Sequence, residues 1–364
     1  MRVVIAGGGT GGHLYPGIAV ARELLARQPD AQISFAGTAR GIESRVVPRE
    51  GFALDLLRSA GLKGKSIVDR ARGALMVPLG VIDASRIVAM RKPDLVIGVG
   101  GYSSGPVVLV AALRGVPTMV LEQNAVPGLT NRLLARFVKA AAVTFDSTAA
   151  FFGSKAFVSG NPVRPEFLAT AGPLQESALG DQTSTTRVLV FGGSQGAHAI
   201  NVAMVEAAAE LAAGRPHLRL THQTGERDVE MVRTAYQNAG LPAVVEPFLY
   251  DMGRQLGEAD VVVCRAGATT LAEITAAGKA AILIPLPTAT DDHQRKNAEA
   301  LAANGAADVL LQRDMNGPTL AARILSLVAD GERRSRMASA ARSMARPDAA
   351  KVIVDRALEL ARQA

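Results

Sequence analysis

The sequence predicts an α/β protein made of two Rossmann-like domains that face a cleft. Short β-branched runs alternate with long Ala/Leu-rich stretches of helical period, which is typical of a parallel sheet covered by helices on both faces. A strand that runs into a glycine cluster and then a helix occurs twice, far apart in the chain. A length of 364 residues also suits two domains of roughly 150 residues each.

The predicted strands are short and apolar. They cover residues 3–6, 33–36, 95–99, 118–121, 188–191, 261–264 and 281–284. The turn signal Gly160-Asn161-Pro162 and the polar stretch 170–186 place the domain boundary near residue 160. We therefore expect domains at 1–160 and 161–345. Residues 346–364 include an amphipathic C-terminal helix that can pack back across either domain.

The composition fits a globular protein in a reducing compartment. Hydrophobic residues make up 48% and charged residues 20%, which excludes a disordered chain. The single cysteine, Cys264, excludes a disulfide framework and a cysteine metal cluster. No stretch reaches the ~18 apolar residues needed to span a bilayer, and the apolar run 3–6 is too short for a secretory signal. We expect the protein to stay in the cytoplasm.

Positive charge is concentrated in the first half of the chain. Residues 1–160 hold 19 Lys and Arg against 10 Asp and Glu, a net charge of +9, whereas residues 161–364 hold 21 against 23, a net charge of −2. Eight basic and two acidic residues lie between Arg58 and Lys92, which indicates a surface for a polyanion. Residues 53–101 contain no aromatic side chain to stack on bases, so anionic lipid is favoured over nucleic acid.

An apolar cluster lies inside this basic stretch. Its members are Leu75, Met76, Val77, Leu79, Val81 and Ile82, and its basic flanks are Lys63, Lys65, Arg70, Arg72, Arg86 and Arg91. Apolar side chains among lipid tails, with cations among anionic headgroups, would seat the domain on a membrane surface. The alternative is an ordinary core helix with a solvated basic face, and the charge of +9 favours membrane contact.

Four glycine loops follow strands, where backbone amides and helix N-termini bind anions. The loop at 7–12 matches the pattern Gly-x-Gly-x-x-Gly, which on its own indicates a nicotinamide or flavin dinucleotide. The acidic residue that such a site needs after its second strand is missing, because that strand ends in Phe35-Ala36-Gly37-Thr38. A dinucleotide-binding oxidoreductase remains an alternative.

The loop at 192–196 matches Gly-x-Ser-x-Gly, the nucleophile elbow of α/β-hydrolases. In that alternative Ser194 is the nucleophile, and its partners are a later Asp and one of His217, His222 or His293. No His-Gly-Gly oxyanion loop precedes it, and a hydrolase does not need two domains of similar design. The Ser194 hydroxyl can equally cap a helix or contact a phosphate.

The third and fourth glycine loops lie at residues 264–273 and 100–106. Residues 264–273 lead from a strand into a helix on which Thr269 and Glu273 share a face, so amides and hydroxyls can bind a diphosphate while the carboxylate accepts ribose hydroxyls. Residues 100–106 place Pro106 in the first turn of a helix. Four such loops over two domains indicate two phosphate-bearing ligands.

Seven motifs lie in order between residues 5 and 300. They are His13-Leu14-Tyr15-Pro16-Gly17, Gly100-Gly101-Tyr102-Ser103-Ser104-Gly105-Pro106, Glu122-Gln123-Asn124, Gly160-Asn161-Pro162-Val163-Arg164, Gly192-Gly193-Ser194-Gln195-Gly196-Ala197, the 264–273 segment, and His293-Gln294 with Asn297. Together they resemble the MurG family of bacterial cell-wall glycosyltransferases. The resemblance implies the GT-B fold, with the acceptor bound by the N-terminal domain and UDP-N-acetylglucosamine by the C-terminal domain.

The resemblance also implies a reaction and its partners. N-acetylglucosamine would pass with inversion to the C4 hydroxyl of the muramyl sugar of undecaprenyl-pyrophosphoryl-N-acetylmuramyl-pentapeptide (lipid I), giving lipid II in peptidoglycan synthesis. The implied partners are UDP-N-acetylglucosamine, lipid I and the anionic inner-membrane surface, with no nucleic acid. The implied location is the cytoplasmic face of the cell membrane, as a peripheral protein. No cofactor and no metal are implied, since the family lacks an Asp-x-Asp motif and so does this chain.

Site residues carried over by the resemblance fall into two groups. The implied donor contacts are Thr10, Gly11, Gly12, Asn124, Arg164, Ser194, the backbone of Leu249 at the uracil, Ala268, Thr269, Thr270, Leu271, Ala272, Glu273 and Gln294. The implied acceptor loop is Gly101, Tyr102, Ser103 and Ser104. Matching backwards from Asn297 assigns Gln294 rather than His293 to the sugar.

An inverting displacement also needs a base for the acceptor hydroxyl and groups that stabilise the departing UDP. The helix N-termini at Ser194 and Ala268 and the Arg164 cation suit the second task.

The candidates for the base are His13, Glu122 and Tyr102. His13 precedes a helix whose positive end favours a neutral imidazole that can accept a proton. Glu122 is equally suited to a structural role, in which it holds the 100–106 loop.

Overall fold

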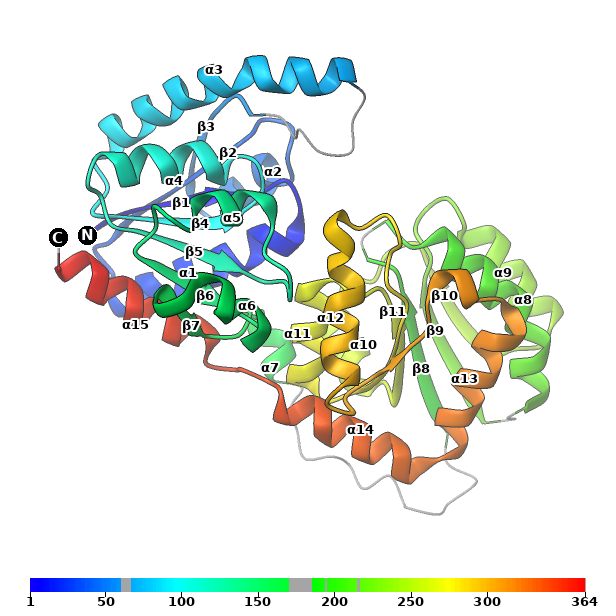
Figure 1. The fold of residues 1–364 in the computed structure, drawn as a ribbon. Coiled ribbons are helices and arrows are strands. Elements are labelled where there is room, and N and C mark those ends of the chain that lie inside the picture. The colour runs from blue at the N-terminus through cyan, green and yellow to red at the C-terminus, as the bar shows by residue number, and fades with distance from the viewer. Residues whose placement is uncertain (60–66, 170–184, 194, 215–216, 364) are drawn as a thin grey trace. The chain divides into compact units, whose positions relative to one another are not determined.

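The computed structural model describes residues 1–59, 67–169, 185–193, 195–214 and 217–363 (Figure 1). The chain divides into two compact units, one of Met1–Val163 with Arg346–Ala364 and one of Arg164–Ala345. We call them the N-terminal unit and the C-terminal unit. Each contains a parallel sheet with helices around it, which confirms the predicted fold class.

In the described part of the N-terminal unit, the sheet has seven parallel strands in the order β3-β2-β1-β4-β5-β6-β7. The strands are β1 (Arg2–Gly7), β2 (Gln32–Gly37), β3 (Ala53–Leu56), β4 (Leu95–Gly100), β5 (Thr118–Glu122), β6 (Ala140–Val143) and β7 (Ala156–Val158). The helices are α1 (Gly11–Arg27), α2 (Glu43–Arg49), α3 (Ile67–Arg91), α4 (Ser104–Leu113), α5 (Leu129–Leu134), α6 (Asp146–Phe152) and α15 (Ala349–Arg362).

Both faces of this sheet are covered, because alternate side chains of a strand point to opposite sides. In β1, Val3 and Ile5 pack in the cluster under α1 and α15. Val4 and Ala6 pack in the other cluster, under α3 and α4. A central strand that is buried on both faces is apolar throughout, and it therefore appears in the sequence as a continuous run of apolar residues.

In the described part of the C-terminal unit, six parallel strands follow the order β10-β9-β8-β11-β12-β13. The strands are β8 (Thr186–Phe191), β9 (Leu218–Gln223), β10 (Ala243–Glu246), β11 (Val261–Cys264), β12 (Ala280–Leu283) and β13 (Asp308–Val309). The helices are α7 (Pro165–Ala169), α8 (His198–Gly214), α9 (Val229–Asn238), α10 (Met252–Glu258), α11 (Ala268–Ala277), α12 (His293–Ala302), α13 (Gly317–Ala329) and α14 (Gly331–Ser343).

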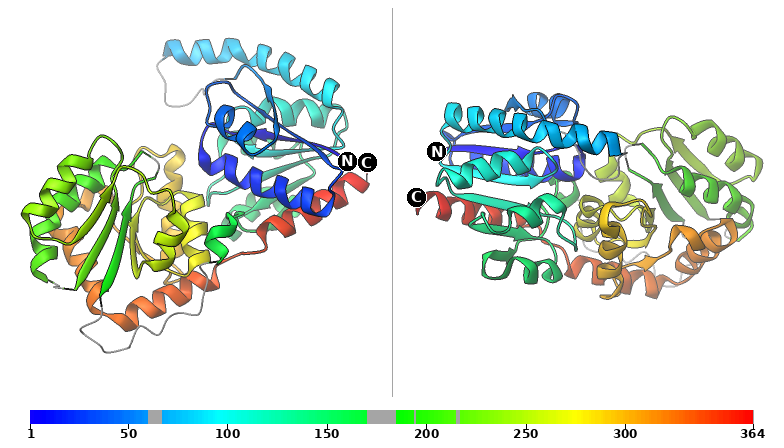
Figure 2. Two further views of the ribbon diagram at one scale, coloured as in Figure 1. Left: turned by 180° about the vertical axis from the view of Figure 1, so that it is seen from behind. Right: turned by 45° about the horizontal axis from the view of Figure 1, so that its top comes forward.

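The C-terminal helix α15 packs on the N-terminal unit, beside α1 (Figure 2). Its apolar face buries Ile353, Val354 and Leu360 in the same cluster as α1. Arg27 of α1 forms an ion pair with Asp355 of α15. The last helix of the chain therefore completes the unit with which the chain begins.

Candidate functional site

In the C-terminal unit, two loops meet at the carboxyl ends of the central strands. β8 and β11 are neighbours, and their last residues, Phe191 and Cys264, pair with each other. The strand order reverses between them, which is where doubly wound sheets bind ligands. The loop after β8 begins at Gly192, and the loop after β11 leads through Gly267 into α11. Ser194, assigned to the donor, lies outside the described residues.

The N-terminus of α11 suits an anion. Gly267 precedes the helix in an extended conformation, with φ −68° and ψ 140°. Ala268, Thr269 and Thr270 are partly exposed, and the first turn of a helix presents its backbone amides outward. Leu271 is buried in the core, so its side chain faces away from such a ligand. Direct contacts from this turn would therefore come from 268–270.

Glu273, one turn inside α11 after the partly exposed Ala272, is paired with Arg164. Arg164 Nη2 donates to Glu273 Oε1 at 3.0 Å, and Arg164 Nη1 lies 3.2 Å from a carboxylate oxygen of Glu166. The Glu273 side chain is only 10% exposed. Burial raises the pKa of its carboxyl to about 7, although Arg164 acts in the opposite direction. Two residues assigned to the donor from distant motifs thus meet within one unit.

The first turn of α12 is tied to the loop that precedes α11. The side-chain oxygen of Gln294 accepts hydrogen bonds from the amides of Ala266 at 3.2 Å and Leu286 at 3.0 Å. Among the described residues, no acceptor is bonded to the side-chain nitrogen of Gln294, so this nitrogen can donate to a ligand. His293 is turned to the Thr290 carbonyl, 2.6 Å from its Nδ1. The geometry favours Gln294 over His293 as the residue beside the α11 loop.

Leu249 lies in the turn between β10 and α10. Its side chain is buried, so a ligand would meet it through its backbone. The neighbouring rings of Phe248 and Tyr250 are exposed and pack edge to face, with their centroids 5.0 Å apart.

In the N-terminal unit, the corresponding loops follow β1 and β4. Gly7 pairs with Gly100, and the Gly8 amide donates to the Gly100 carbonyl at 3.3 Å. Thr10 is exposed just before α1, and Gly11 and Gly12 form the first turn of that helix. These three residues therefore lie at the carboxyl edge of the sheet.

A buried carboxylate that sequence reasoning missed holds the 7–12 loop. Glu43 is 1% exposed and accepts hydrogen bonds from the amides of Gly9 and Thr38, each at 2.8 Å, and from the Thr38 hydroxyl at 2.9 Å. A Cβ at Gly8 would lie 2.6 Å from this carboxyl group. In a dinucleotide site the loop amides bind the pyrophosphate. Here the Gly9 amide already donates to the Glu43 carboxylate and is not available to a pyrophosphate, which counts against the nicotinamide or flavin alternative.

His13 lies in the first turn of α1, beside the end of β4. Its Nδ1 is 3.3 Å from the side-chain oxygen of Gln123, the residue that follows β5. A Cβ added to Gly100 would lie 2.7 Å from the same nitrogen. The imidazole is therefore packed at the carboxyl edge of the sheet, as the sequence predicts for this base candidate.

Glu122 is buried, and four donors surround its carboxylate. Oε1 accepts from the Asn124 amide at 3.1 Å and from the Asn124 side chain at 3.3 Å. Oε2 accepts from the Gly128 amide at 2.9 Å and from the Asn131 side chain at 2.8 Å. The geometry favours a structural role for Glu122 over a role as base. It holds the loop after β5 and the start of α5 (residues 124–131) and not the 100–106 loop as predicted, because its carboxylate turns to the segment after its own strand.

The 101–104 loop exposes one side chain and hides two. Tyr102 is 50% exposed, and its carbonyl accepts from the Ser59 hydroxyl at 3.1 Å. Ser103 and Ser104 are buried at the start of α4. An acceptor would thus meet Tyr102 and the backbone of Gly101, while the two serine side chains face the protein.

Two of the three histidines proposed for the hydrolase alternative are not placed for that chemistry. His222 is fully buried between Asn201 and Tyr236, and burial lowers its pKa to about 3. His217 precedes β9 beside Thr186, the first residue of β8, so it lies at the opposite end of the sheet from the 192–196 loop.

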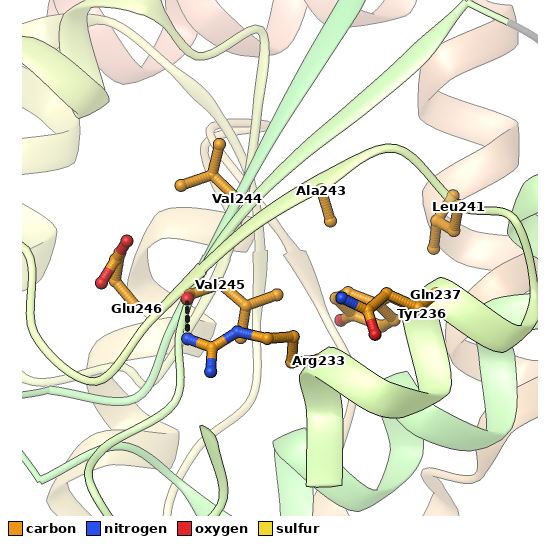
Figure 3. A pocket seen from close by; sticks show the side chains of 8 residues that line it. All are labelled: Arg233, Tyr236, Gln237, Leu241, Ala243, Val244, Val245 and Glu246. Carbon is orange, nitrogen blue, oxygen red and sulfur yellow. Dashed lines mark hydrogen bonds between the residues drawn. The ribbon is translucent and has the colours of Figure 1, made fainter. Parts of the chain in front are cut away.

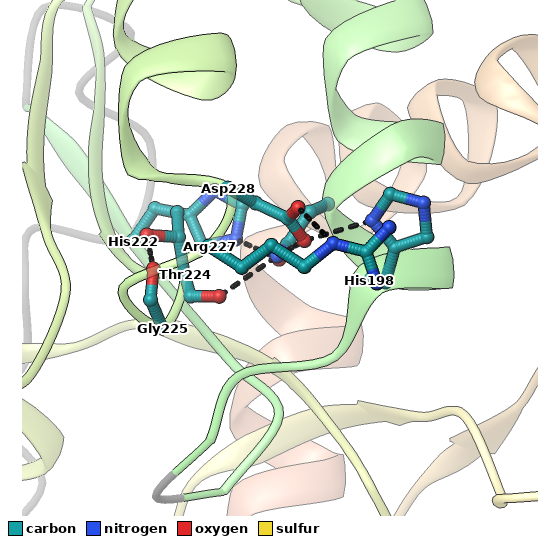
Figure 4. Close-up of polar contacts among 7 residues, drawn as sticks. His198, His222, Thr224, Gly225, Arg227 and Asp228 are labelled. Atoms are coloured by element: carbon teal, nitrogen blue, oxygen red, sulfur yellow. Dashed lines mark hydrogen bonds and ion pairs between the residues drawn. The ribbon is translucent and has the colours of Figure 1, made fainter.

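A histidine–aspartate pair does lie near that loop, but with a different histidine. His198, the first residue of α8, contacts Asp228 with 2.9 Å between Nδ1 and Oδ2 (Figure 4). Asn201 also donates to Asp228 Oδ2, at 2.8 Å. The pair braces the start of α8 against the loop before α9, and it gives the hydrolase alternative no support.

A pocket of about 260 Å³ lies between α9 and the edge strand β10 (Figure 3). Arg233 crosses it to donate to the Val245 carbonyl at 3.1 Å. No residue assigned to a ligand lines this pocket, so it is separate from the candidate site. Among the residues that the structure describes, no three His, Cys, Asp or Glu side chains are placed to hold a metal ion, and no helix is long and apolar enough to cross a membrane.

The two units match two domains of one glycosyltransferase family. Residues 3–143 match the N-terminal domain of glycosyltransferase family 28, and residues 187–353 match its C-terminal domain.

Curated relatives align over nearly the whole chain. The UDP-N-acetylglucosamine–N-acetylmuramyl-(pentapeptide) pyrophosphoryl-undecaprenol N-acetylglucosamine transferase of Pelobacter propionicus is 48% identical, over 98% of this chain and 99% of the relative. The enzyme of that name from Geotalea uraniireducens is 47% identical, over 98% and 97%.

Solved structures agree with these matches. MurG from Acinetobacter baumannii is 31% identical, with a TM-score of 0.80, over 98% of this chain and 99% of that chain. UDP-GlcNAc 2-epimerase from Neisseria meningitidis, 15% identical with a TM-score of 0.71 over 99% and 100%, shares the fold. The chain therefore belongs to the MurG family of N-acetylglucosamine transferases, and its units have the GT-B fold.

Proposed function

We propose that this protein transfers N-acetylglucosamine from UDP-N-acetylglucosamine to the C4 hydroxyl of the muramyl sugar of lipid I, with inversion, to form lipid II in peptidoglycan synthesis. The observation that carries the proposal is the Arg164–Glu273 pair at the first turns of α11. At this place the C-terminal unit brings together an amide-rich helix N-terminus, the Arg164 cation and the Glu273 carboxylate. These are the groups that a nucleoside diphosphate requires.

In this proposal the C-terminal unit binds the UDP part of the donor. The amides of 268–270 and the Arg164 guanidinium face the diphosphate and stabilise the charge that develops as UDP departs. The Glu273 carboxylate accepts the ribose hydroxyls, Gln294 donates to the sugar, and the backbone of Leu249 contacts the uracil. Arg164 then has two roles: it binds the diphosphate of the donor, and it forms an ion pair with Glu273 when no nucleotide is bound.

The N-terminal unit, in the same proposal, binds the acceptor and supplies the base. His13 takes the proton of the C4 hydroxyl as the oxygen attacks the anomeric carbon. Thr10, Gly11, Gly12 and Asn124 contact the transferred sugar. Gly101 and Tyr102, with the backbone at Ser103 and Ser104, contact the acceptor pyrophosphate.

We further propose that α3 seats the N-terminal unit on the cytoplasmic face of the cell membrane. In its described second half, Ala84, Ile87 and Val88 face the core, whereas Leu79 and Ile82 are exposed by 38% and 45%. These exposed side chains favour membrane contact over the core-helix alternative. The side chains of 75–77, Lys63, Lys65, Arg70 and Arg72 lie outside the described residues.

One cation of the predicted basic rim is engaged within the protein. Arg91 donates to both oxygens of Asp55 at 2.8 Å. Arg86 is exposed, as a membrane-facing cation requires.

The direct test of the proposal is a transfer assay. Purified enzyme, UDP-N-acetylglucosamine labelled in the sugar and a short-chain lipid I analogue should give a β1,4-linked disaccharide and one equivalent of UDP. NAD, NADP and FAD should leave the thermal unfolding midpoint unchanged, whereas the UDP-sugar should raise it. Release of free labelled sugar at the same rate with and without acceptor would contradict a transferase.

The Glu273 carboxyl should make donor binding depend on pH. Because its pKa in the free enzyme is about 7, the carboxyl takes up a proton as pH falls, and it then loses acceptor capacity for the ribose hydroxyls. Isothermal titration should show weaker binding below about pH 7. Glu273→Gln should weaken binding by about 1.5 to 3 kcal/mol under alkaline conditions and should remove the pH dependence.

Glu166→Gln is the matched control for this experiment, since Glu166 also contacts Arg164 but its side chain is 49% exposed. Its affinity should stay within about twofold of the parent, as expected of an exposed pair. An equal loss in both variants would assign the effect to Arg164 and remove Glu273 from the ribose site.

The exposed face of α3 should be required for vesicle binding. Leu79→Ser with Ile82→Ser should weaken sedimentation with anionic vesicles about tenfold or more, because two apolar side chains no longer enter the lipid. Arg70, Arg72 and Arg86 replaced together by Glu should abolish it, since each cation contributes on the order of 1 kcal/mol. Activity on a short-chain soluble acceptor should persist in both cases.

A matched control replaces two exposed apolar residues of the C-terminal unit, Met231 and Val244, by Ser. This variant should sediment like the parent. Equal loss on soluble and membrane-embedded acceptors in the α3 variants would show that the face belongs to the fold or the active site and not to a membrane contact.

A further inference from the structure

We propose that Gln123 is a positioning residue that fixes the tautomer and the orientation of His13. The inference rests on the proposed role of His13 as the base, and it adds a residue that none of the sequence motifs assigns to catalysis. Its basis is a chain of two hydrogen bonds, from His13 to Gln123 and from Gln123 to the backbone of β4.

The orientation of the Gln123 amide is set by its neighbour on β4. The side-chain nitrogen donates to the Val99 carbonyl at 3.0 Å, and both residues are buried. A backbone carbonyl can only accept, so the nitrogen end of the amide must face Val99. The oxygen end of the same planar group is then turned to His13.

This orientation determines which imidazole nitrogen carries the hydrogen. The Gln123 oxygen lies 3.3 Å from His13 Nδ1, and an amide oxygen offers only lone pairs. In the neutral ring Nδ1 must therefore be the donor, and Nε2 holds the lone pair. A base needs that lone pair in a defined place to take a proton from an attacking hydroxyl.

The ring is also confined from the side of β4. Gly100 has φ +96°, and a Cβ there would lie 2.7 Å from His13 Nδ1 and 2.9 Å from Cε1. The imidazole thus fills the space that any other residue at position 100 would occupy. Contact with Gly100 and the bond to Gln123 together leave the ring little freedom to turn.

The adjacent carboxylate is directed elsewhere. Glu122 is hydrogen-bonded to residues 124–131, whereas Gln123 points to His13, because successive residues at a strand end face opposite sides. The orienting group is thus a neutral amide. In Ser-His-Asp triads a carboxylate has this position and also stabilises the imidazolium. Here Gln123 orients the base without adding charge.

The tautomer can be read directly by NMR. In enzyme labelled with ¹⁵N in its five histidines, the His13 signals are identified by their loss in His13→Gln. Long-range proton–nitrogen spectra of the parent should show hydrogen on Nδ1. Gln123→Met, of similar size but without an acceptor, should shift a large fraction of His13 to the Nε2–H form. Gln123→Glu, which keeps an acceptor oxygen, should retain the Nδ1–H form.

The kcat for transfer should change together with the tautomer of His13. Gln123→Met should lower kcat about 10- to 100-fold, the range typical of lost orienting hydrogen bonds, with the KM for UDP-N-acetylglucosamine nearly unchanged. Gln123→Glu should recover most of this loss. In a His13→Ala background, Gln123→Met should cost nothing further, because the two residues act as a unit.

Thr148→Val controls for a general loss of buried hydrogen bonding, since the Thr148 hydroxyl donates to the Asn124 carbonyl at 2.9 Å. It should lower stability and leave the His13 tautomer unchanged. Hydrogen on Nε2 in the parent, or an unchanged tautomer in Gln123→Met, would overturn the positioning role. A shifted tautomer with full kcat would instead overturn His13 as the base.

Discussion

The close approach of β1 and β4, the two central strands of the N-terminal sheet, is the constraint on which the loops around His13 depend. Strand order reverses between β1 and β4 and between β8 and β11, so the loops that leave these strands diverge and open a place for a ligand. In the N-terminal unit Gly7 pairs with Gly100, and the backbones come so near that side chains there would collide. Gly7 and Gly100, which stand in two of the glycine loops, are thus required by strand geometry before any ligand is considered.

Although the two units share a fold, buried charges make their loops chemically different. In the N-terminal unit, carboxylates of Glu43 and Glu122 already accept the loop amides, which pre-organises the backbone around His13. In the C-terminal unit the buried acid is Glu273, and its partner is the Arg164 cation. The first arrangement holds His13, the proposed base, on a fixed loop, and the second holds a cation beside a helix N-terminus, which suits an anion. This difference supports opposite roles for the two units in one transfer reaction.

Sequence reasoning recovered the central strands because burial on both faces makes them continuous apolar runs. It did not single out β6 (Ala140–Val143), whose alanines have little strand preference, or the interior strand β9 (Leu218–Gln223), which carries several polar residues. It also missed edge strands such as β13. Arg164 and Glu273 were found through motifs, but their pairing was not, since nothing local links residues 109 positions apart. Glu43 was overlooked because a lone acid on a helix carries no spacing signal. Gln123 stands in the motif Glu122-Gln123-Asn124, but the sequence does not show which side chain it contacts, so it received no role. In the structure, their hydrogen bonds identify them: Glu43 accepts from loop amides, and Gln123 bonds to Val99 and His13.

The proposed binding of UDP by the C-terminal unit can be tested by hydrogen exchange in the presence of UDP alone. UDP lacks the transferred sugar, so amide exchange should become slower in the loops that follow β8 and β11, including the first turn of α11. The loops that follow β1 and β4 should exchange as in the free enzyme. Protection strongest at Gly7–Gly12, with none at α11, would show instead that the first glycine loop binds the nucleotide.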